Sequence, residues 1–196
     1  MSENRLIGVL ALQGDYEAHR KALARAGAES VPVRKAAELD RVAGLVIPGG
    51  ESTTILNLLQ GEGMFEPLRE FGARKPVFGT CAGAILLASE VSRPSQESLG
   101  LVEMAVARNA YGRQVDSRVV RLAPEPAFGE AAGDGGELEA VFIRAPIIRS
   151  LGACGKVLLR YQGDPVLVDF GRHLVATFHP ELTEDPRVHR IFVSKI

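Results

Sequence analysis

The sequence has few cysteines, almost no net charge and no long apolar run. Its two cysteines, Cys81 and Cys154, are too few for a disulfide framework, and neither belongs to a Cys/His cluster of the kind that binds zinc. The 23 Lys and Arg residues balance 24 Asp and Glu residues, so the overall field favours neither nucleic acid nor an anionic membrane. No apolar run approaches the roughly 20 residues of a membrane span, and residues 1–5 lack the features of a secretory signal. These absences predict a cytoplasmic protein without a metal site, whose partner is a small molecule or another protein.

The composition is that of a folded globular protein. Hydrophobic residues make up 46% of the chain and charged residues 24%, which is too apolar for a disordered segment. A length of 196 residues suits one compact domain, which we assign to residues 1–196. In a reducing compartment, a lone cysteine is then either a packing residue or a nucleophile.

The first half of the chain alternates short apolar runs with helix-forming segments. Residues 6–12 are continuously apolar, as in a strand buried on both faces of a parallel sheet. Asp15 can cap the next helix, and Gly27 can end it in the left-handed conformation. This alternation predicts an α/β fold with an open, mainly parallel sheet and with sites at the carboxyl ends of its strands. We expect strands at 6–12, 30–33, 45–47 and 76–79, and helices at 16–26, 53–59, 64–71 and 82–89.

The second half is less regular. Its short strand candidates are joined by turn-like residues, so we expect antiparallel strands added beside the parallel core. Residues 123–139, rich in Pro, Ala, Gly and Glu, are predicted to form a mobile surface loop. The strand candidates are residues 115–122, 140–143, 157–161, 166–170 and 174–178.

Cys81 lies between a predicted buried strand and a predicted helix, in the sequence Gly-Thr-Cys-Ala-Gly. A sharp strand-to-helix turn strains the backbone at its apex and tolerates only small flanking residues, and it holds a nucleophile outward from the sheet. The turn also places the thiol at a helix N-terminus, where unpaired amides favour a thiolate. The alternative is a buried small hydrophobe flanked by chance glycines.

His179 and Glu181 follow the last predicted strand and should reach the same sheet edge as Cys81. A thiol nucleophile needs a base to move its proton, and the base needs a third group to orient it. Pro180 between them restricts the backbone and favours a turn that brings the two side chains together. The alternative is a histidine at a strand end beside an unrelated surface glutamate.

The remaining candidates are weaker. His19, His173 and His189 are expected on the surface or in helix packing, and Cys154 is expected to be structural. Residues 48–53 (PGGEST) form a glycine loop between a strand and a helix, which can offer amides to an oxyanion and hold a polar substrate. The simpler reading of this loop is a turn with Ser52 as the helix N-cap, and no phosphate-loop signature is present.

Taken together, the blocks around Cys81 and His179 resemble the class I, or triad, glutamine amidotransferases. Four longer blocks, 48–54 (PGGESTT), 108–114 (RNAYGRQ), 142–146 (FIRAP) and 178–185 (FHPELTED), more narrowly resemble the family of glutaminase subunits of pyridoxal 5′-phosphate synthase. The likeness runs from Ile7 nearly to the C-terminus. Residues 130–137 depart from it in being longer and richer in glycine.

This resemblance implies a flavodoxin-like fold and the hydrolysis of L-glutamine to glutamate and ammonia, without a metal or organic cofactor. The ammonia would pass to a synthase subunit of the PdxS/SNZ type, in a large hetero-oligomer with a dodecameric core. That subunit would make pyridoxal 5′-phosphate from ribose 5-phosphate and glyceraldehyde 3-phosphate. The roles implied are Cys81, His179 and Glu181 in catalysis; Gly50, Glu51, Ser52, Arg108, Ile143 and Arg144 in glutamine binding; Gly49, Gly50 and Ala82 in the oxyanion hole; and Gln13 and Gly14 in contact with the partner.

Two other hypotheses remain open at this level. The first is a glutaminase serving another pathway, such as imidazole glycerol phosphate or aminobenzoate synthesis, because a triad alone does not distinguish these. The second is a non-catalytic binding module or redox sensor in which Cys81 only oxidises or caps a pocket. The 108–114 and 181–185 blocks favour the vitamin pathway over the first, and the complete triad disfavours the second.

Overall fold

A central, mainly parallel sheet organises the chain, as predicted. The computed structural model describes residues 5–108, 117–133 and 136–196. In the order β10-β11-β12-β4-β3-β1-β2, the strands from β12 to β2 are parallel, whereas β10 and β11 pair antiparallel at one edge. The seven strands are β1 (Ile7–Leu10), β2 (Ser30–Val33), β3 (Gly44–Ile47), β4 (Val77–Thr80), β10 (Lys156–Tyr161), β11 (Asp164–Asp169) and β12 (Leu174–Ala176).

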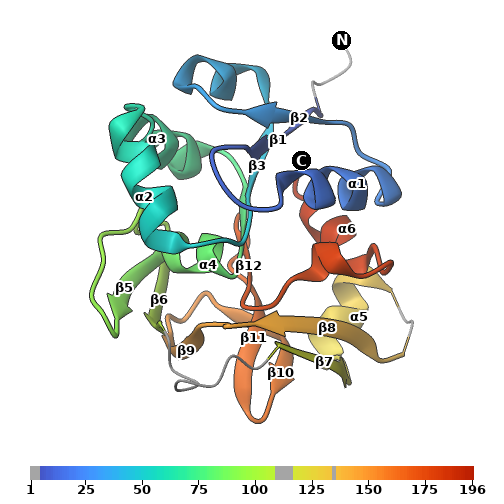
Figure 1. Ribbon diagram of the computed structural model, residues 1–196. Helices are drawn as coiled ribbons and strands as arrows, with labels where there is room; N and C mark the ends of the chain where they lie inside the picture. Colours follow the sequence, from blue (N-terminus) through green and yellow to red (C-terminus); the bar gives the residue numbers. More distant parts are fainter. Residues whose placement is uncertain (1–4, 109–116, 134–135) are drawn as a thin grey trace.

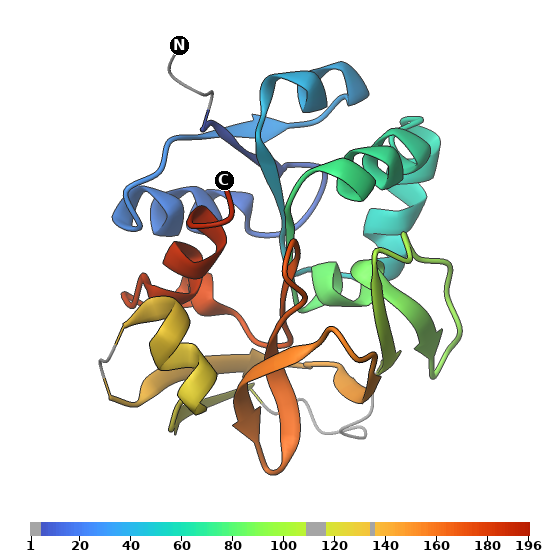
Figure 2. The same cartoon turned by 180° about the vertical axis from the view of Figure 1, so that it is seen from behind.

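Helices cover both faces of this sheet (Figure 1), and the view from behind shows the same two layers (Figure 2). Successive residues of a strand point to opposite faces, and in β3 Leu45 and Ile47 accordingly join one core cluster while Val46 joins the other. One cluster packs under α2, α3 and α4, and the other under α1, α5 and α6. The helices are α1 (Tyr16–Arg25), α2 (Ser52–Gly61), α3 (Phe65–Arg74), α4 (Ala82–Leu87), α5 (Pro126–Ala132) and α6 (Arg187–Val193), with 3₁₀ turns η1 (Ala36–Arg41) and η2 (Pro180–Leu182).

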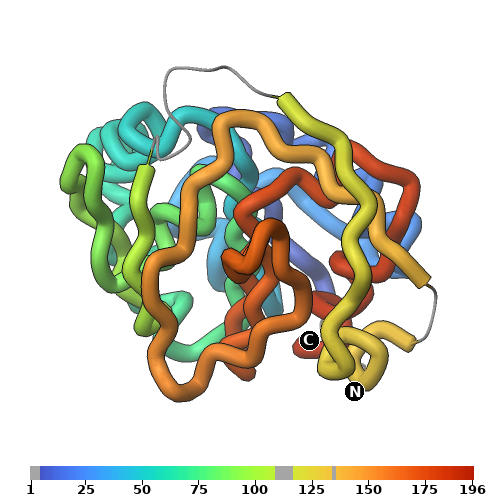
Figure 3. The backbone as a smooth tube through the Cα atoms, turned by 90° about the horizontal axis from the view of Figure 1, so that it is seen from below, coloured from blue at the N-terminus to red at the C-terminus, as the bar shows by residue number. Residues whose placement is uncertain are grey.

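Two small sheets are added beside the central one; in the view from below, β7 and β8 pass in front, and β5 and β6 lie toward the left edge (Figure 3). Sequence patterns missed three of their strands, β5, β6 and β9, and extended the predicted helix 82–89 two residues beyond α4. These strands are short, and both ladders contain register shifts; β6 alternates buried with more exposed residues over 102–106, but too briefly to be distinguished in the sequence. The added strands are β5 (Ala88–Ser92), β6 (Val102–Ala107) and β9 (Ile147–Leu151) in one sheet, and β7 (Ser117–Leu122) and β8 (Leu138–Ile143) in the other.

The loop predicted for residues 123–139 is wrong over most of its length. Pro126 begins helix α5, where a proline loses no hydrogen bond, and Phe128 is fully buried in the core. Glu125 N–H also donates to the Leu158 carbonyl, which ties the segment to β10. A high content of Pro and Gly therefore marked helix ends here. Across the described parts of the chain, no helix combines the length and apolarity needed to cross a lipid bilayer.

Candidate active site

Cys81 stands at the apex of the turn between β4 and α4. Its backbone has φ 46° and ψ −101°, a region that a residue with a side chain adopts only under strain. Its N–H donates to the Ala176 carbonyl at 2.9 Å, which holds the turn against β12. The strand, sharp turn and helix predicted around this cysteine are therefore present, and the strained apex is typical of a nucleophile elbow.

Glycines let three segments meet at this turn. A Cβ on Gly83 would collide with the Ile47 carbonyl of β3, and one on Gly79 would lie 2.6 Å from the Gly83 backbone. A Cβ on Gly49 would collide with the His179 ring and lie 3.3 Å from the Cys81 Cβ. The small residues are therefore a packing requirement of the site, and chance glycines do not account for them.

His179 and Glu181 form a buried pair beside Cys81. Nδ1 of His179 lies 2.8 Å from Oε1 of Glu181, and η2 begins between them at Pro180. Burial by itself lowers the pKa of His179, but interactions with the Cys81 sulfur and the Glu181 carboxylate outweigh it and raise the pKa to about 10. Burial raises the pKa of Glu181, whereas His19 and His179 lower it, with a net shift downward. Both groups are thus held in their charged forms near neutral pH.

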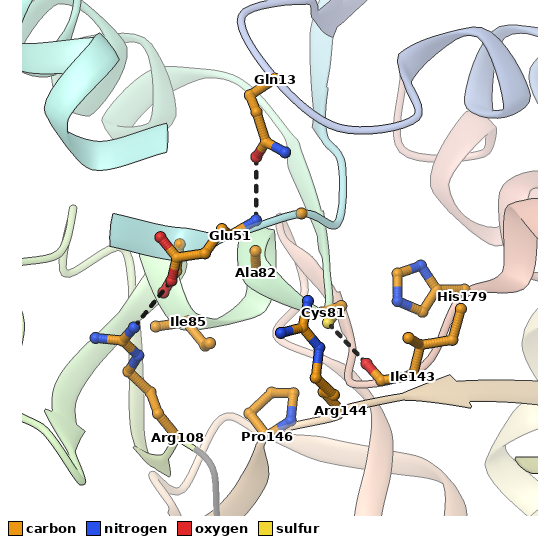
Figure 4. A pocket seen from close by; sticks show the side chains of 12 residues that line it. Gln13, Glu51, Cys81, Ala82, Ile85, Arg108, Ile143, Arg144, Pro146 and His179 are labelled. Carbon is orange, nitrogen blue, oxygen red and sulfur yellow. Dashed lines mark hydrogen bonds and ion pairs between the residues drawn. The ribbon is translucent and has the colours of Figure 1, made fainter. Parts of the chain in front are cut away.

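The second nitrogen of the imidazole faces the nucleophile without a bond to it. Among the described residues, Nε2 of His179 has no hydrogen-bond partner, and the Cys81 sulfur lies 3.8 Å from the Ile143 carbonyl. Figure 4 shows the imidazole beside Cys81 on the side away from Glu51. In the charged imidazolium, Nε2 therefore carries a proton that it can give up and later recover.

A cavity of about 230 Å³ opens over Cys81. Its wall combines the glycine loop before α2 with the end of β8 and the segment after it (Figure 4). The structure brings together all six residues predicted to bind glutamine, together with Cys81, His179, Ala82 and Gln13; Gly49, Gly14 and Glu181 are not in the wall. The lining residues are Gln13, Gly50, Glu51, Ser52, Cys81, Ala82, Ile85, Arg108, Ile143, Arg144, Pro146 and His179.

Glu51 organises the polar side of this cavity. Its carboxylate accepts from Thr54 N–H at 2.7 Å, so Glu51 is the N-cap of α2, and the simpler reading with Ser52 as the cap is wrong. Arg108 lies 3.2 Å from the other carboxylate oxygen and also donates to Thr53 at 2.9 Å. Burial raises the pKa of Glu51, but the amides of Thr54 and Thr53 and the charge of Arg108 bring it below the ordinary value. The site therefore presents a fixed carboxylate beside a fixed guanidinium.

Arg144 is placed differently from Arg108. It is exposed and has φ 46°, a second strained residue at the site. Figure 4 draws its guanidinium beside Cys81, with no hydrogen bond to the other lining residues. An unpaired guanidinium beside a nucleophile can meet the carboxylate of an incoming ligand.

The loop at Gln13 and Gly14 interlocks with the glycine loop. The Gln13 side chain accepts from Glu51 N–H at 3.0 Å, and a Cβ on Gly50 would collide with it. A Cβ on Gly14, whose φ is 96°, would collide with the Gly49 carbonyl. The conformation of one loop is therefore tied to that of the other.

The comparisons with known proteins agree with this geometry. The model of the SNO glutamine amidotransferase family matches residues 9–196. The chain belongs to this family. A relative from Solibacter usitatus, described as pyridoxal 5′-phosphate synthase subunit PdxT, is 59% identical over 97% of this chain and 98% of its own length. A protein of the same description from Koribacter versatilis is 52% identical over 97% of this chain and 95% of its own. A solved glutamine amidotransferase superposes with a TM-score of 0.86 at 46% identity, covering 96% of this chain and 97% of the other.

Sequence reasoning about this SNO family chain missed several polar residues around the site. His19, His173 and His189 are all buried, so of the two positions expected for them the surface is wrong, while helix packing holds for His19 in α1 and His189 in α6. His19 shares the buried face of α1 with Ala22 and Leu23, a spacing of three and four residues that predicts burial. Gln96, which accepts from Ser52 at 2.9 Å, gave no signal because it lies in a loop distant in sequence.

Three further expectations concern Cys154, the 108–114 block and metal binding. Cys154 is exposed, so a packing role for it is wrong. The part of the 108–114 block after Arg108 lies outside the described residues. Within the described residues, no group of three or more His, Cys, Asp or Glu side chains is arranged to hold a metal ion.

Proposed function

We propose that this chain is the glutaminase subunit of a pyridoxal 5′-phosphate synthase, and that residues 1–196 act as one domain. The proposal is supported chiefly by Cys81 and His179 lining one cavity, with Glu181 2.8 Å behind the His179 ring, in a member of the SNO family. The two relatives, both described as synthase subunits, match this chain over nearly their whole length. By this proposal the chain consumes L-glutamine and releases L-glutamate and ammonia.

The reaction begins with attack of the Cys81 sulfur on the side-chain amide carbon of glutamine. Amides near Gly49, Gly50 and Ala82 stabilise the oxyanion, since the first amides of a helix lack partners within the helix. His179 gives its Nε2 proton to the departing nitrogen, the C–N bond breaks and ammonia leaves a thioester. The same imidazole then deprotonates water, which hydrolyses the thioester to glutamate, and Glu181 holds the ring through Nδ1.

Glutamine recognition uses the charged side of the cavity. We assign Gly50, Glu51, Ser52, Arg108, Ile143 and Arg144 to it, because all six line the cavity that contains the sulfur. The Glu51 carboxylate suits the α-ammonium group, and the Arg144 guanidinium suits the α-carboxylate. Arg108 acts on Glu51, from which it is separated by 3.2 Å.

The partner follows from the product. Ammonia equilibrates with ammonium in water, so direct transfer to a partner preserves the nucleophile; the family resemblance implies that this partner is a synthase subunit of the PdxS/SNZ type, in a large hetero-oligomer with a dodecameric core. Gln13 and Gly14 lie on the loop that the resemblance assigns to that contact, and we place the chain in the cytoplasm. No organic cofactor or metal enters the glutaminase step, and pyridoxal 5′-phosphate is the product of the assembly.

The decisive test compares two nitrogen sources. The chain is mixed with its synthase subunit, ribose 5-phosphate and glyceraldehyde 3-phosphate, and pyridoxal 5′-phosphate is followed by absorbance with either glutamine or ammonium chloride. Cys81→Ala should lose the glutamine-dependent reaction by several powers of ten, on the order of 10⁶ by comparison with a serine hydrolase. The same variant should retain the ammonium-dependent reaction.

The matched control is Cys154→Ala, which changes the exposed cysteine and should retain both reactions. Glutamine-dependent synthesis by Cys81→Ala would overturn the mechanism. Glutamate release without any pyridoxal 5′-phosphate would instead indicate a glutaminase of another pathway.

A further inference from the structure

Four buried polar side chains behind the active site form a chain that ends at Glu181. Nδ1 of His19 lies 3.1 Å from Nε2 of His189, and Nε2 of His19 lies 3.0 Å from Thr80 Oγ1. The same His19 nitrogen lies 3.4 Å from Oε2 of Glu181, which has no hydrogen-bond partner among the described residues. The two histidines and Thr80 are fully buried, and they come from α1, α6 and β4. The proposed reaction so far uses none of them.

The positions of the acceptors determine where the protons lie in this chain. With the proton of His19 on Nε2, this nitrogen donates to Thr80 and turns a positive N–H edge toward Glu181 without a hydrogen bond to it, and Nδ1 accepts from Nε2–H of His189. Nδ1 of His189, which has no partner in the described structure, is then only an unused lone pair. The reverse arrangement would bury an unpaired N–H on His189 and turn a lone pair of His19 toward the carboxylate, which costs more. Both rings are therefore assigned as neutral Nε2–H tautomers.

We propose that His19 is a positioning residue of the glutaminase reaction: held by His189 and Thr80, it keeps its polar Nε2–H edge 3.4 Å from Oε2 of Glu181, and this electrostatic contact favours the carboxylate orientation in which Oε1 faces His179. The inference rests on the proposed function. It gives the carboxylate an imidazole on each side, His179 on Oε1 and His19 on Oε2. A carboxylate with one oxygen free can rotate and weaken its bond to the catalytic base.

Helix α1 is a firm support for this task. Asp15 caps it through Ala18 N–H at 3.1 Å. Near its other end, Arg25 donates to the Thr183 carbonyl at 2.8 Å, directly after the 3₁₀ turn that carries Glu181. The helix thus contacts the Glu181 segment at two points, through His19 and through Arg25.

The groups that face His19 come from every packed element. They are Glu181 and His179 from the η2 segment, His189 from α6 and Asp15 from the start of α1, with Arg25 acting on His189. Burial lowers the pKa of His19 and lowers that of His189 to about 3, so both rings are neutral at ordinary pH. Removing the His19 donor leaves the buried carboxylate less stabilised and raises the pKa of Glu181. The rate falls at low pH because Glu181 becomes protonated, and this acid limb of the rate profile then moves to higher pH.

The test uses three variants in the complex with the synthase subunit, with glutamate release measured against glutamine concentration and pH. His19→Leu removes the polar N–H edge and should lower kcat roughly 3- to 10-fold, about the worth of one ordinary hydrogen bond. It should leave KM nearly unchanged and shift the acid limb upward. His19→Gln keeps an N–H near Nε2 and should recover most of kcat and the original limb.

His173→Gln is the matched control, because His173 is buried but bonds to Val77 N–H at 3.2 Å and not to Glu181. It should lower Tm without moving the acid limb. If His19→Leu and His19→Gln lowered kcat by the same factor and left the acid limb unmoved, His19 would have only a structural role, like that expected of His173. Wild-type rates in His19→Leu would also overturn the proposal.

A measurement on the wild-type chain does not depend on how the variants fold. The ¹⁵N shifts of the ring nitrogens should report Nε2–H on both His19 and His189, and an Nδ1–H tautomer of His19 would overturn the proposal. Failure of the proposed function would look different, because the wild-type complex would then release no glutamate while the tautomers stayed as assigned.

Discussion

His179 is held between a carboxylate and a sulfur that both favour its protonated form. Its pKa in the folded chain is raised to about 10, against an ordinary 6.5. A raised pKa stabilises the fold fully below the ordinary value, and this contribution declines as pH rises and is lost through the folded-state pKa. The contribution of His179 to stability should therefore disappear between about pH 6.5 and about pH 10.

We predict that Cys81→Ala lowers the pKa of His179, because the interaction with the sulfur is one cause of its elevation. The loss of stability attributed to His179 should then begin at lower pH in the variant than in the wild type. NMR titration of the imidazole gives the pKa, and urea unfolding at a series of pH values gives the stability. An unchanged His179 pKa in the variant would show that the sulfur has no influence on the ring.

Substitutions of the two arginines at the cavity should differ in their effect on stability. Arg108 is buried and paired with Glu51 and Thr53. Arg108→Met leaves the Glu51 carboxylate without its cation, so KM for glutamine should rise about 10-fold or more and Tm should fall. Arg144 is exposed, and Arg144→Met should raise KM with little change in Tm. Steady-state kinetics and thermal unfolding separate these outcomes, and an unchanged KM in both variants would remove the arginines from glutamine binding.

Residue types and their spacing predicted the reacting groups but not what supports them. Cys81 and His179 are identifiable because each follows a strongly apolar strand, and parallel strands end at one edge. His19 contacts Glu181 from a distance of more than a hundred residues, and only its place on the buried face of α1 hinted at its burial. Long-range side-chain pairs leave little trace in local patterns.

At the scale of elements, the turn from β4 into α4 depends on close backbone contact with β3. A Cβ at Gly83 would collide with the Ile47 carbonyl, and a backbone atom cannot move aside as a side chain can. We predict that Gly83→Ala destabilises the fold by about 1–3 kcal/mol, even though alanine is the better helix former by about 1 kcal/mol.

The matched control is Gly129→Ala in α5, where nothing lies within 4 Å of the added Cβ. Helix propensity then acts alone, and stability should rise by up to about 1 kcal/mol. Urea midpoints with unchanged m-values measure both effects. Equal stability of Gly83→Ala and wild type would show that the turn accommodates the added methyl group without a clash.

The strands buried on both faces gave the strongest signal in the sequence. Strands β1, β3 and β4 are buried on both faces and appear as continuous apolar runs, which give a strong signal. The strands β5 and β9 show no regular alternation and β6 alternates only briefly, so the tertiary contacts that create this sheet leave little local periodicity. Helix α5 was missed because its few apolar residues, Phe128 above all, are surrounded by Gly, Pro and Ala.

At the scale of the whole molecule, the carboxyl edge of the sheet gathers loops from both helical layers. The loop before α1 meets the loop before α2 at Gln13 and Glu51, so a protein that binds one layer can act on the other. We predict that the isolated chain is a poor glutaminase and that the synthase subunit raises kcat more than it lowers KM. Realigning one oxyanion donor is worth roughly 100- to 1,000-fold in rate, and it acts on the transition state rather than on bound glutamine.

The same contact provides the variant that tests this coupling. Gly14 has φ 96° and lies against the Gly49 carbonyl, so Gly14→Ala should abolish most of the activation by the synthase subunit. Gly27→Ala is its control at the other end of α1, because Gly27 has φ 84° with nothing within 4 Å of the added Cβ. Both variants carry the same backbone strain, about 1 kcal/mol or more of stability, but only Gly14→Ala disturbs the glycine loop. Steady-state glutamate release with and without saturating synthase subunit gives the activation ratio of each variant. Equal activation of Gly14→Ala and Gly27→Ala would rule out coupling through this loop, and equal turnover of the wild type in both conditions would rule out gating by the partner.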